Sequence, residues 1–355
     1  MRGLASLYRN NFDILLFQLS NFLYSPLLYF LLGNKAAESS LFVLKTIYLI
    51  EVYLAVPVVV FYFNQRRTAE MVDASGRRLY DGIALTKLVF SILTAFVVIY
   101  ILKAAEPALL PIILASFFGN AITPHWLLTR HNYTVFTMTS LAFRALVLLL
   151  VLFGQDGLIL ACYAASLLLP GLFSFFYFRV RQPVIEQTRI STKILTLVGF
   201  GLLPMVRNFA TSTLLLALLS SAPSQNLSLY ATIERIIRSS FSFMVPYLLR
   251  ANLRGSIPQF SHPLISLALA MGAALIYYFR PDEITAWLIA AALVLFLDLM
   301  VFIHSERVGS ELVSNFFYLL LGGIVVVAIF SPERYYLLLG LLAFFPLLMK
   351  KTVGS

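Results

Sequence analysis

Nine ionisable side chains fall inside long apolar stretches of this sequence, where a charge is costly and usually serves a function. Six are basic and three are acidic: Lys45, Lys87, Arg144, Arg207, Arg235 and Arg238, and Glu51, Glu234 and Asp298. Arginine suits phosphate, because its planar fork donates bidentate, charge-assisted hydrogen bonds and stays charged at any working pH. The excess of cations predicts a positive cavity for an anionic substrate, such as the pyrophosphate head of a lipid-linked molecule.

The position of each cation along its stretch separates two groups. Lys45 and Lys87 lie near an expected membrane face, where either ammonium can extend to the lipid headgroups. Lys45 nevertheless remains a candidate for substrate binding. Arg144 and Arg207 lie near the middle of their stretches, so each should line a wet cavity or form a buried ion pair with Glu51 or Asp298.

The segment 228–240 is the most polar of the expected spans, with three charges in five residues. Arg235 and Arg238 are three residues apart and share one helix face, whereas Glu234 and Arg238 are four apart and can pair. Such a helix should line a hydrated cavity. We therefore predict substrate binding by Arg144, Arg207, Arg235, Arg238 and Lys45. The candidate counter-ions or proton-coupling groups are Glu51, Glu234 and Asp298.

Proline and asparagine interrupt two further stretches. Asn21 and Pro26 lie in the first expected span, and Pro204 and Asn208 in the seventh. Proline in a spanning helix marks a kink whose freed carbonyl must be satisfied inside the protein. These four residues are predicted to form gates that bend; ordinary packing of the two helices is the alternative.

Composition identifies the elements that must position these residues. The 355-residue chain is 60% hydrophobic and only 12% charged, too few charges to cover the surface of a soluble protein. Runs of 18 or more apolar residues are long enough to cross a bilayer as helices. Twelve spans are expected, at approximately 12–32, 40–63, 81–102, 107–128, 134–153, 157–178, 194–219, 228–249, 263–279, 284–303, 311–330 and 335–349.

The loop charges orient the chain. With both termini in the cytoplasm, the cytoplasmic loops and ends carry sixteen Lys and Arg and the outer loops carry four. Cytoplasmic loops of membrane proteins are enriched in these residues, so the bias supports both the count and the orientation. The net charge of +10 therefore needs no nucleic-acid partner. The cytoplasmic segment Gln65–Met71 is expected to be a short interfacial helix or a solvated loop.

The longest central connection divides the chain into two halves. We predict an N-terminal six-helix bundle at 1–178, a cytoplasmic linker at 179–193 and a C-terminal six-helix bundle at 194–355. Ser40-Leu41-Phe42 and Ser228-Leu229-Tyr230 open the second and eighth spans, each followed 24 residues later by an arginine. This indicates a weak parallel repeat, and hence an all-α, polytopic protein of two pseudo-symmetric six-helix bundles.

Signals of catalysis are not visible in the sequence. It has no glycine-rich nucleotide loop, no histidines at metal-ligand spacing and no paired carboxylates in a loop. We therefore expect a transporter rather than an enzyme, with no cofactor and no metal. Its energy would come from an ion gradient, the membrane potential or the gradient of the substrate.

Three segments together resemble the Wzx-type polysaccharide flippases of the multidrug/oligosaccharidyl-lipid/polysaccharide exporter superfamily. The first runs from Gly119 to Leu128 and leads into a span with Arg144, the second runs from Tyr62 to Glu70, and the third from Asn226 to Ile237. Their order and topology match across most of the chain. The chain departs from the family in its short loops and in Arg130, which stands where the family tends to have glycine.

The resemblance implies two six-helix bundles with alternating access, as in the related MATE exporters. It implies a monomer in the bacterial inner membrane that moves an undecaprenyl-pyrophosphate-linked oligosaccharide, such as an O-antigen unit, to the periplasmic leaflet. Its partners would be membrane lipids and polysaccharide-assembly proteins such as a polymerase or a chain-length regulator. The alternatives are an ion-coupled antiporter of small molecules, a membrane-embedded polymerase or glycosyltransferase, and a scaffold protein that transports nothing.

Overall fold

The computed structural model describes residues 12–35, 37–62, 65–124, 134–154, 156–185, 190–220, 227–232 and 234–236. In these residues the regular structure is entirely helical and contains no β-strand, which confirms the predicted all-α class for this part of the chain. The chain forms two compact units, residues 1–208 and 209–355, and the description below concerns the first. The predicted division at 179–193 and the count of twelve spans remain predictions.

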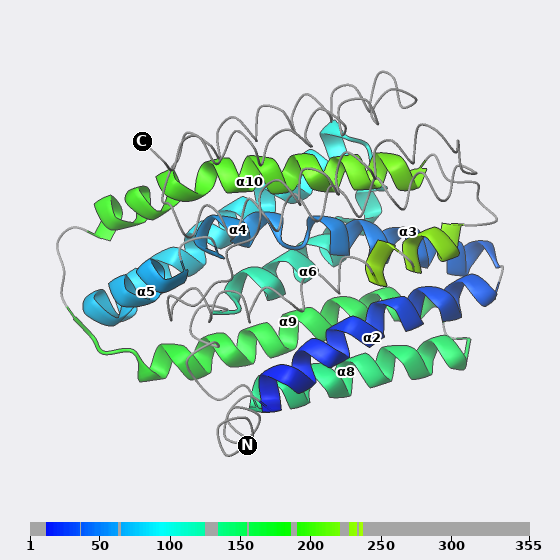
Figure 1. Ribbon diagram of the computed structural model, residues 1–355, viewed down its shortest axis with the longest axis horizontal. Helices are drawn as coiled ribbons and strands as arrows, with labels where there is room; N and C mark the ends of the chain where they lie inside the picture. Colours follow the sequence, from blue (N-terminus) through cyan, green and yellow to red (C-terminus); the bar gives the residue numbers. More distant parts are fainter. Residues whose placement is uncertain are drawn as a thin grey trace, which may run out of the picture. The chain divides into compact units, whose positions relative to one another are not determined.

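The first seven expected spans all correspond to helical segments, which Figure 1 shows. The helices are α2 (Phe12–Asn34), α3 (Glu38–Tyr53), α4 (Val56–Tyr62), α5 (Gln65–Phe96), α6 (Leu110–Ile122), α8 (Thr134–Leu152), α9 (Asp156–Arg181) and α10 (Ile190–Ser220). A π-helical turn, Val97–Ile101, ends α5, and a 3-10 turn, Pro107–Leu109, precedes α6. The eighth expected span begins with helical residues 227–232 and 234–236, and its remainder lies outside the described residues.

Three helical segments of the described residues are long and apolar enough to cross a membrane: Glu38–Phe61, Thr68–Ile101 and Gly157–Arg181. The outward faces of the bundle are apolar as well. On α2, Leu19, Leu23, Leu27 and Phe30 recur at helical spacing and are all about half exposed. A continuous apolar stripe of this kind suits contact with lipid rather than with water. These features give the unit the character of a membrane protein.

The break between α3 and α4 has a local cause at Pro57. Proline lacks an amide hydrogen and its ring clashes with the preceding turn, so a helix cannot pass through it regularly. The amide nitrogens of Val58 and Val59 turn back to the carbonyl of Ala55, and the carbonyl of Leu54 loses its place in the helical ladder. The side-chain nitrogen of Asn120 on α6 donates to that carbonyl at 2.7 Å. A side-chain amide from a neighbouring helix therefore supplies a hydrogen bond to the carbonyl exposed by the break.

A second irregularity divides α5. Gly76 has φ +70° and ψ −158°, so α5 consists of a short helix before Gly76 and a longer one after it. The short helix buries one face, formed by Thr68, Ala69, Val72 and Ser75. Segment Gln65–Met71 is therefore helical, and its expected location at the membrane interface remains a prediction.

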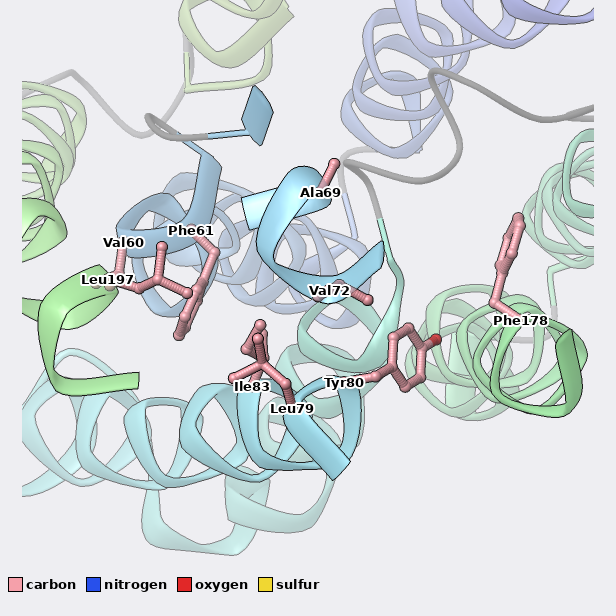
Figure 2. Close-up of a cluster of buried hydrophobic side chains, with 9 residues drawn as sticks. All are labelled: Val60, Phe61, Ala69, Val72, Leu79, Tyr80, Ile83, Phe178 and Leu197. Atoms are coloured by element: carbon pink, nitrogen blue, oxygen red, sulfur yellow. The ribbon is translucent and has the colours of Figure 1, made fainter. Parts of the chain in front are cut away.

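The hydrophobic core on both sides of Gly76 in the sequence joins four helices. Its buried side chains come from α4, α5, α9 and α10 (Figure 2): Val60, Phe61, Ala69, Val72, Leu79, Tyr80, Ile83, Phe178 and Leu197.

Two close approaches between helix backbones tighten the bundle. A Cβ on Gly171 of α9 would lie 2.2 Å from the carbonyl oxygen of Gly119 on α6, and one on Gly201 would lie 2.2 Å from that of Val60. Only glycine allows backbones to pass this closely.

Candidate functional site

The carboxylate of Glu51 is the centre of a buried polar cluster. Its side chain is 7% exposed and accepts hydrogen bonds from three hydroxyl groups. Ser25 donates to Oε1 at 2.7 Å, Tyr163 donates to Oε1 at 3.1 Å, and Tyr29 donates to Oε2 at 2.5 Å. Three hydroxyl groups thus hold this carboxylate in place.

Helix geometry brings these donors together. Ser25 and Tyr29 are four residues apart on α2 and therefore share one face, which meets α3 at Glu51. Tyr163 reaches the same carboxylate from α9, which contacts α3 along its length. Donors from α2 and α9 thus hold the carboxylate of a residue on α3.

Arg144 belongs to α8, and its side chain contacts a neighbouring face of α2. Its side chain is half-buried on α8, and Nη1 donates to the hydroxyl of Ser20 at 2.6 Å. The guanidinium carbon lies 5.3 Å from the centre of the Tyr24 ring, at the distance of a cation–π contact. Ser20 and Tyr24 are also four residues apart, so they form a second polar face of α2. Figure 1 shows α8 beside both α2 and α9.

Tyr24 joins the two parts of the cluster. Its side chain is 7% exposed, and its hydroxyl lies within electrostatic range of both Arg144 and Glu51. We use the name Arg144–Glu51 cluster for Arg144, Glu51 and the hydroxyl residues of α2 and α9 that surround them: Ser20, Tyr24, Ser25, Tyr29 and Tyr163. The cluster brings a positive group, a negative group and several hydroxyl groups together inside a bundle with apolar outer faces.

The two lysines differ from each other. Lys45 on α3 is exposed, as a side chain that extends to headgroups would be. Lys87 on α5 is only 1% exposed, so the interpretation that it snorkels is wrong. Its Nζ donates to the carbonyl of Thr123 at 3.3 Å and lies 5.9 Å from the Phe61 ring centre. That carbonyl follows the last turn of α6, where a helix end carries partial negative charge and attracts cations.

The other predicted site residues are described less completely. Pro26 is buried within α2, and Asn208 is half-buried within α10. Glu234 is buried and Arg235 half-buried in the short helical segment 234–236. Asn21, Pro204 and Arg207 lie in helices, but their side chains are outside the described residues, as are Arg238 and Asp298 entirely. Whether Arg207, Arg235 and Arg238 face Arg144 remains a prediction.

Three tyrosines of the cluster were not predicted from the sequence. In the first span the sequence pointed to Asn21 and Pro26, whereas Tyr24, Tyr29 and Tyr163 resemble ordinary bulky residues of apolar helices. A usable signal was present, because Ser20 with Tyr24 and Ser25 with Tyr29 are two hydroxyl pairs at a spacing of four. Such pairs place two donors on one helix face.

The cluster can bind and balance charge. Within the described ranges, no three His, Cys, Asp or Glu side chains are grouped as metal ligands would be. No protein-family model, curated protein or solved structure matches this chain. The resemblance to polysaccharide flippases therefore remains a prediction from the three quoted segments.

Proposed function

We propose that this chain is a membrane transporter that moves an undecaprenyl-pyrophosphate-linked oligosaccharide across the bacterial inner membrane. The observation that carries the proposal is the position of Arg144. A half-buried guanidinium in an apolar bundle, next to a serine hydroxyl and a tyrosine ring, carries a positive charge and a fork of N–H donors that suit an anion. Phosphate oxygens are the acceptors that best match this planar fork.

Glu51 supports the same proposal as a counter-ion. A cation inside the membrane is expensive when the substrate is absent, and a carboxylate nearby lowers that cost. Its three hydroxyl donors keep Glu51 in place. Arriving phosphate would then replace part of the electrostatic interaction that Glu51 provides to Arg144. Glu234 and Asp298 would have related roles in the second half of the chain.

The transport cycle in this proposal is alternating access between two bundles, with both termini in the cytoplasm. Arg207, Arg235 and Arg238 would add positive charge along the route, and Lys45 would bind the headgroup near the membrane face. Pro26 with Asn21 and Pro204 with Asn208 would provide the bends of the first and seventh spans. These assignments are supported by residue type and position in the sequence.

Arg144 gives a direct test. The full-length protein is reconstituted in vesicles, and the flipping of a fluorescent prenyl-pyrophosphate oligosaccharide is measured for Arg144→Gln and Arg144→Lys. Gln should reduce flipping roughly tenfold or more, since one charged hydrogen bond contributes about 1.5–3 kcal/mol. Lys should retain part of the activity, because it keeps the charge but loses the fork.

Arg179→Gln is the matched control for Arg144→Gln. Arg179 is also an arginine on a long helix, but it is 44% exposed and pairs with Asp81 at 2.9 Å. Its replacement should leave flipping near the normal rate. Normal flipping by Arg144→Gln, or by the double variant Arg207→Ala and Arg235→Ala, would contradict the proposal.

An ion-coupled antiporter of small molecules is the second candidate, and the oxygen-rich surroundings of Glu51 favour it. A carboxylate with three hydroxyl oxygens nearby is a plausible group for exchanging a proton or a monovalent cation during transport. Cells that carry the chain would then resist toxic organic cations, and Glu51→Gln would abolish the resistance. Vesicles would show ion-dependent efflux of the cation and no flipping of the pyrophosphate lipid.

A further inference from the structure

The hydroxyl group of Tyr24 is buried and forms no hydrogen bond with any described residue. The hydroxyls of Tyr29 and Tyr163 differ in this respect, because both donate to Glu51. Buried hydroxyl groups are nearly always paired, because losing a bond to water without replacing it costs free energy. A phenylalanine would fill the same space without that cost. The hydroxyl therefore needs an explanation in another state of the protein.

The surroundings of this hydroxyl indicate what would pair with it. Arg144 lies over the ring of Tyr24, with its guanidinium carbon 5.3 Å from the ring centre. Two kinds of hydrogen-bond donor, the guanidinium N–H groups and the phenolic O–H, are thus close together. A ligand that accepts hydrogen bonds from both must bring acceptor oxygens, and the positive charge of Arg144 selects an oxyanion over a cation.

Glu51 does not take this place. The carboxylate already accepts three hydroxyl bonds, and the Tyr24 hydroxyl is not among its donors in the structure.

We infer that Tyr24 is a substrate-binding residue whose hydroxyl donates a hydrogen bond to a diphosphate oxygen held by Arg144. The inference rests on the proposed function, because that function supplies a substrate with a diphosphate. It adds a neutral donor to a site otherwise predicted from cations. It also assigns a role to α2, which contributes Ser20, Tyr24 and two of the three donors of Glu51 from adjacent faces.

Tyr24→Phe and Tyr29→Phe form a matched pair of variants, because each removes one oxygen atom from the same helix. Binding of farnesyl diphosphate to the purified full-length protein is measured alongside the melting temperature, with farnesol as the ligand that lacks phosphate. Tyr24→Phe should weaken binding of farnesyl diphosphate roughly tenfold and leave farnesol binding unchanged. Its melting temperature without ligand should be equal to or above that of the original protein. Tyr29→Phe should lower the melting temperature, because Glu51 loses a donor.

Only Tyr29→Phe is expected to lower the melting temperature, so the inference can be refuted. Equal binding of farnesyl diphosphate by Tyr24→Phe and the original protein would overturn it. A melting temperature lowered as far as in Tyr29→Phe would also overturn it, since the hydroxyl would then have a partner within the protein. A sodium-dependent stabilisation that Tyr24→Phe abolishes would place a cation beside the hydroxyl and overturn the oxyanion assignment.

Failure of the proposed function gives a different pattern. If the original protein binds farnesyl diphosphate no better than farnesol, and Arg144→Gln changes neither, the diphosphate is not a substrate group and both ideas fail. If Arg144→Gln weakens diphosphate binding while Tyr24→Phe does not, only the role of Tyr24 is refuted. If both variants weaken it, the two residues bind the same group.

Discussion

Replacing Gly76 with alanine perturbs the kink of α5, which contacts the segment that follows α9. Gly76 has φ +70° and ψ −158°, a combination that glycine alone adopts readily. A Cβ there would lie 2.4 Å from the carbonyl oxygen of Pro183. The amide nitrogen of Arg77 donates to the same oxygen at 2.9 Å. A methyl group would therefore strain the backbone and push against an acceptor that is already in use.

The structure offers a control that separates these two effects. Gly154 has φ +74°, but a Cβ at Gly154 would meet nothing within 4 Å. Gly154→Ala should cost about 1–2 kcal/mol for the left-handed backbone alone. Gly76→Ala should cost about 2–5 kcal/mol, because an overpacked contact adds about 1–3 kcal/mol to the backbone strain. The difference reports the contact with Pro183 together with the less favourable ψ of Gly76.

Thermal unfolding of the two variants in the same detergent measures this difference, and trypsin cleavage after Arg189 or Lys193 reports on the connection itself. Gly76→Ala should unfold at a clearly lower temperature than Gly154→Ala and be cleaved faster. Equal melting temperatures and equal cleavage rates would refute the reasoning. They would mean that the segment after α9 moves away from the methyl group at no cost.

Two further predictions concern side chains that satisfy irregular helix ends. Asn120→Ala should lower the free energy of unfolding by about 1–3 kcal/mol, because the Leu54 carbonyl at the α3–α4 break loses its donor. Chemical unfolding measures the loss, and one below about 0.5 kcal/mol would argue that the bond contributes little. Lys87→Met should change stability by less than about 1.5 kcal/mol, since it nearly conserves volume, whereas Lys87→Ala should cost about 2–5 kcal/mol by leaving a cavity. Unfolding midpoints compare the two, and a methionine variant as unstable as the alanine variant would show that the ammonium bond to Thr123 stabilises this region more than packing does.

The helices could be predicted from the sequence because each apolar run had the length of a span. Their irregular points were harder to place. The kink at Pro57 has a residue that causes it, whereas the π-helical turn at Val97–Ile101 lies in an unbroken apolar run. The short helix before Gly76 was expected only as one of two options, because its charged residues resemble a loop. Its buried positions Thr68, Val72 and Ser75 follow a helical period nevertheless.

The candidate site could be predicted only in part. The mid-span position of Arg144 and the cost of a charge in lipid indicated an interior location, and the structure places the side chain half-buried. Glu51 was expected as a counter-ion, but its hydroxyl donors depend on how α2 and α9 are rotated against α3. Side-chain rotation of this kind is set by packing across the whole bundle, which a local pattern does not encode. For Lys87, snorkelling was one of two options, and only the packing of the bundle excludes it.

The arrangement of α2 links the predicted gate to the site. Pro26 lies between Tyr24 and Tyr29, and it gives the carbonyl of Phe22 no amide partner one turn later. Before Pro26, the helix presents Ser20 and Tyr24 to Arg144; beside and after it, Ser25 and Tyr29 bond to Glu51. A change in the bend at Pro26 must therefore move the Arg144 contacts relative to the Glu51 contacts. Because both charges depend on this one helix, a ligand that draws Ser20 and Tyr24 toward its phosphate would strain the hydroxyl donors of Glu51 through the backbone between them.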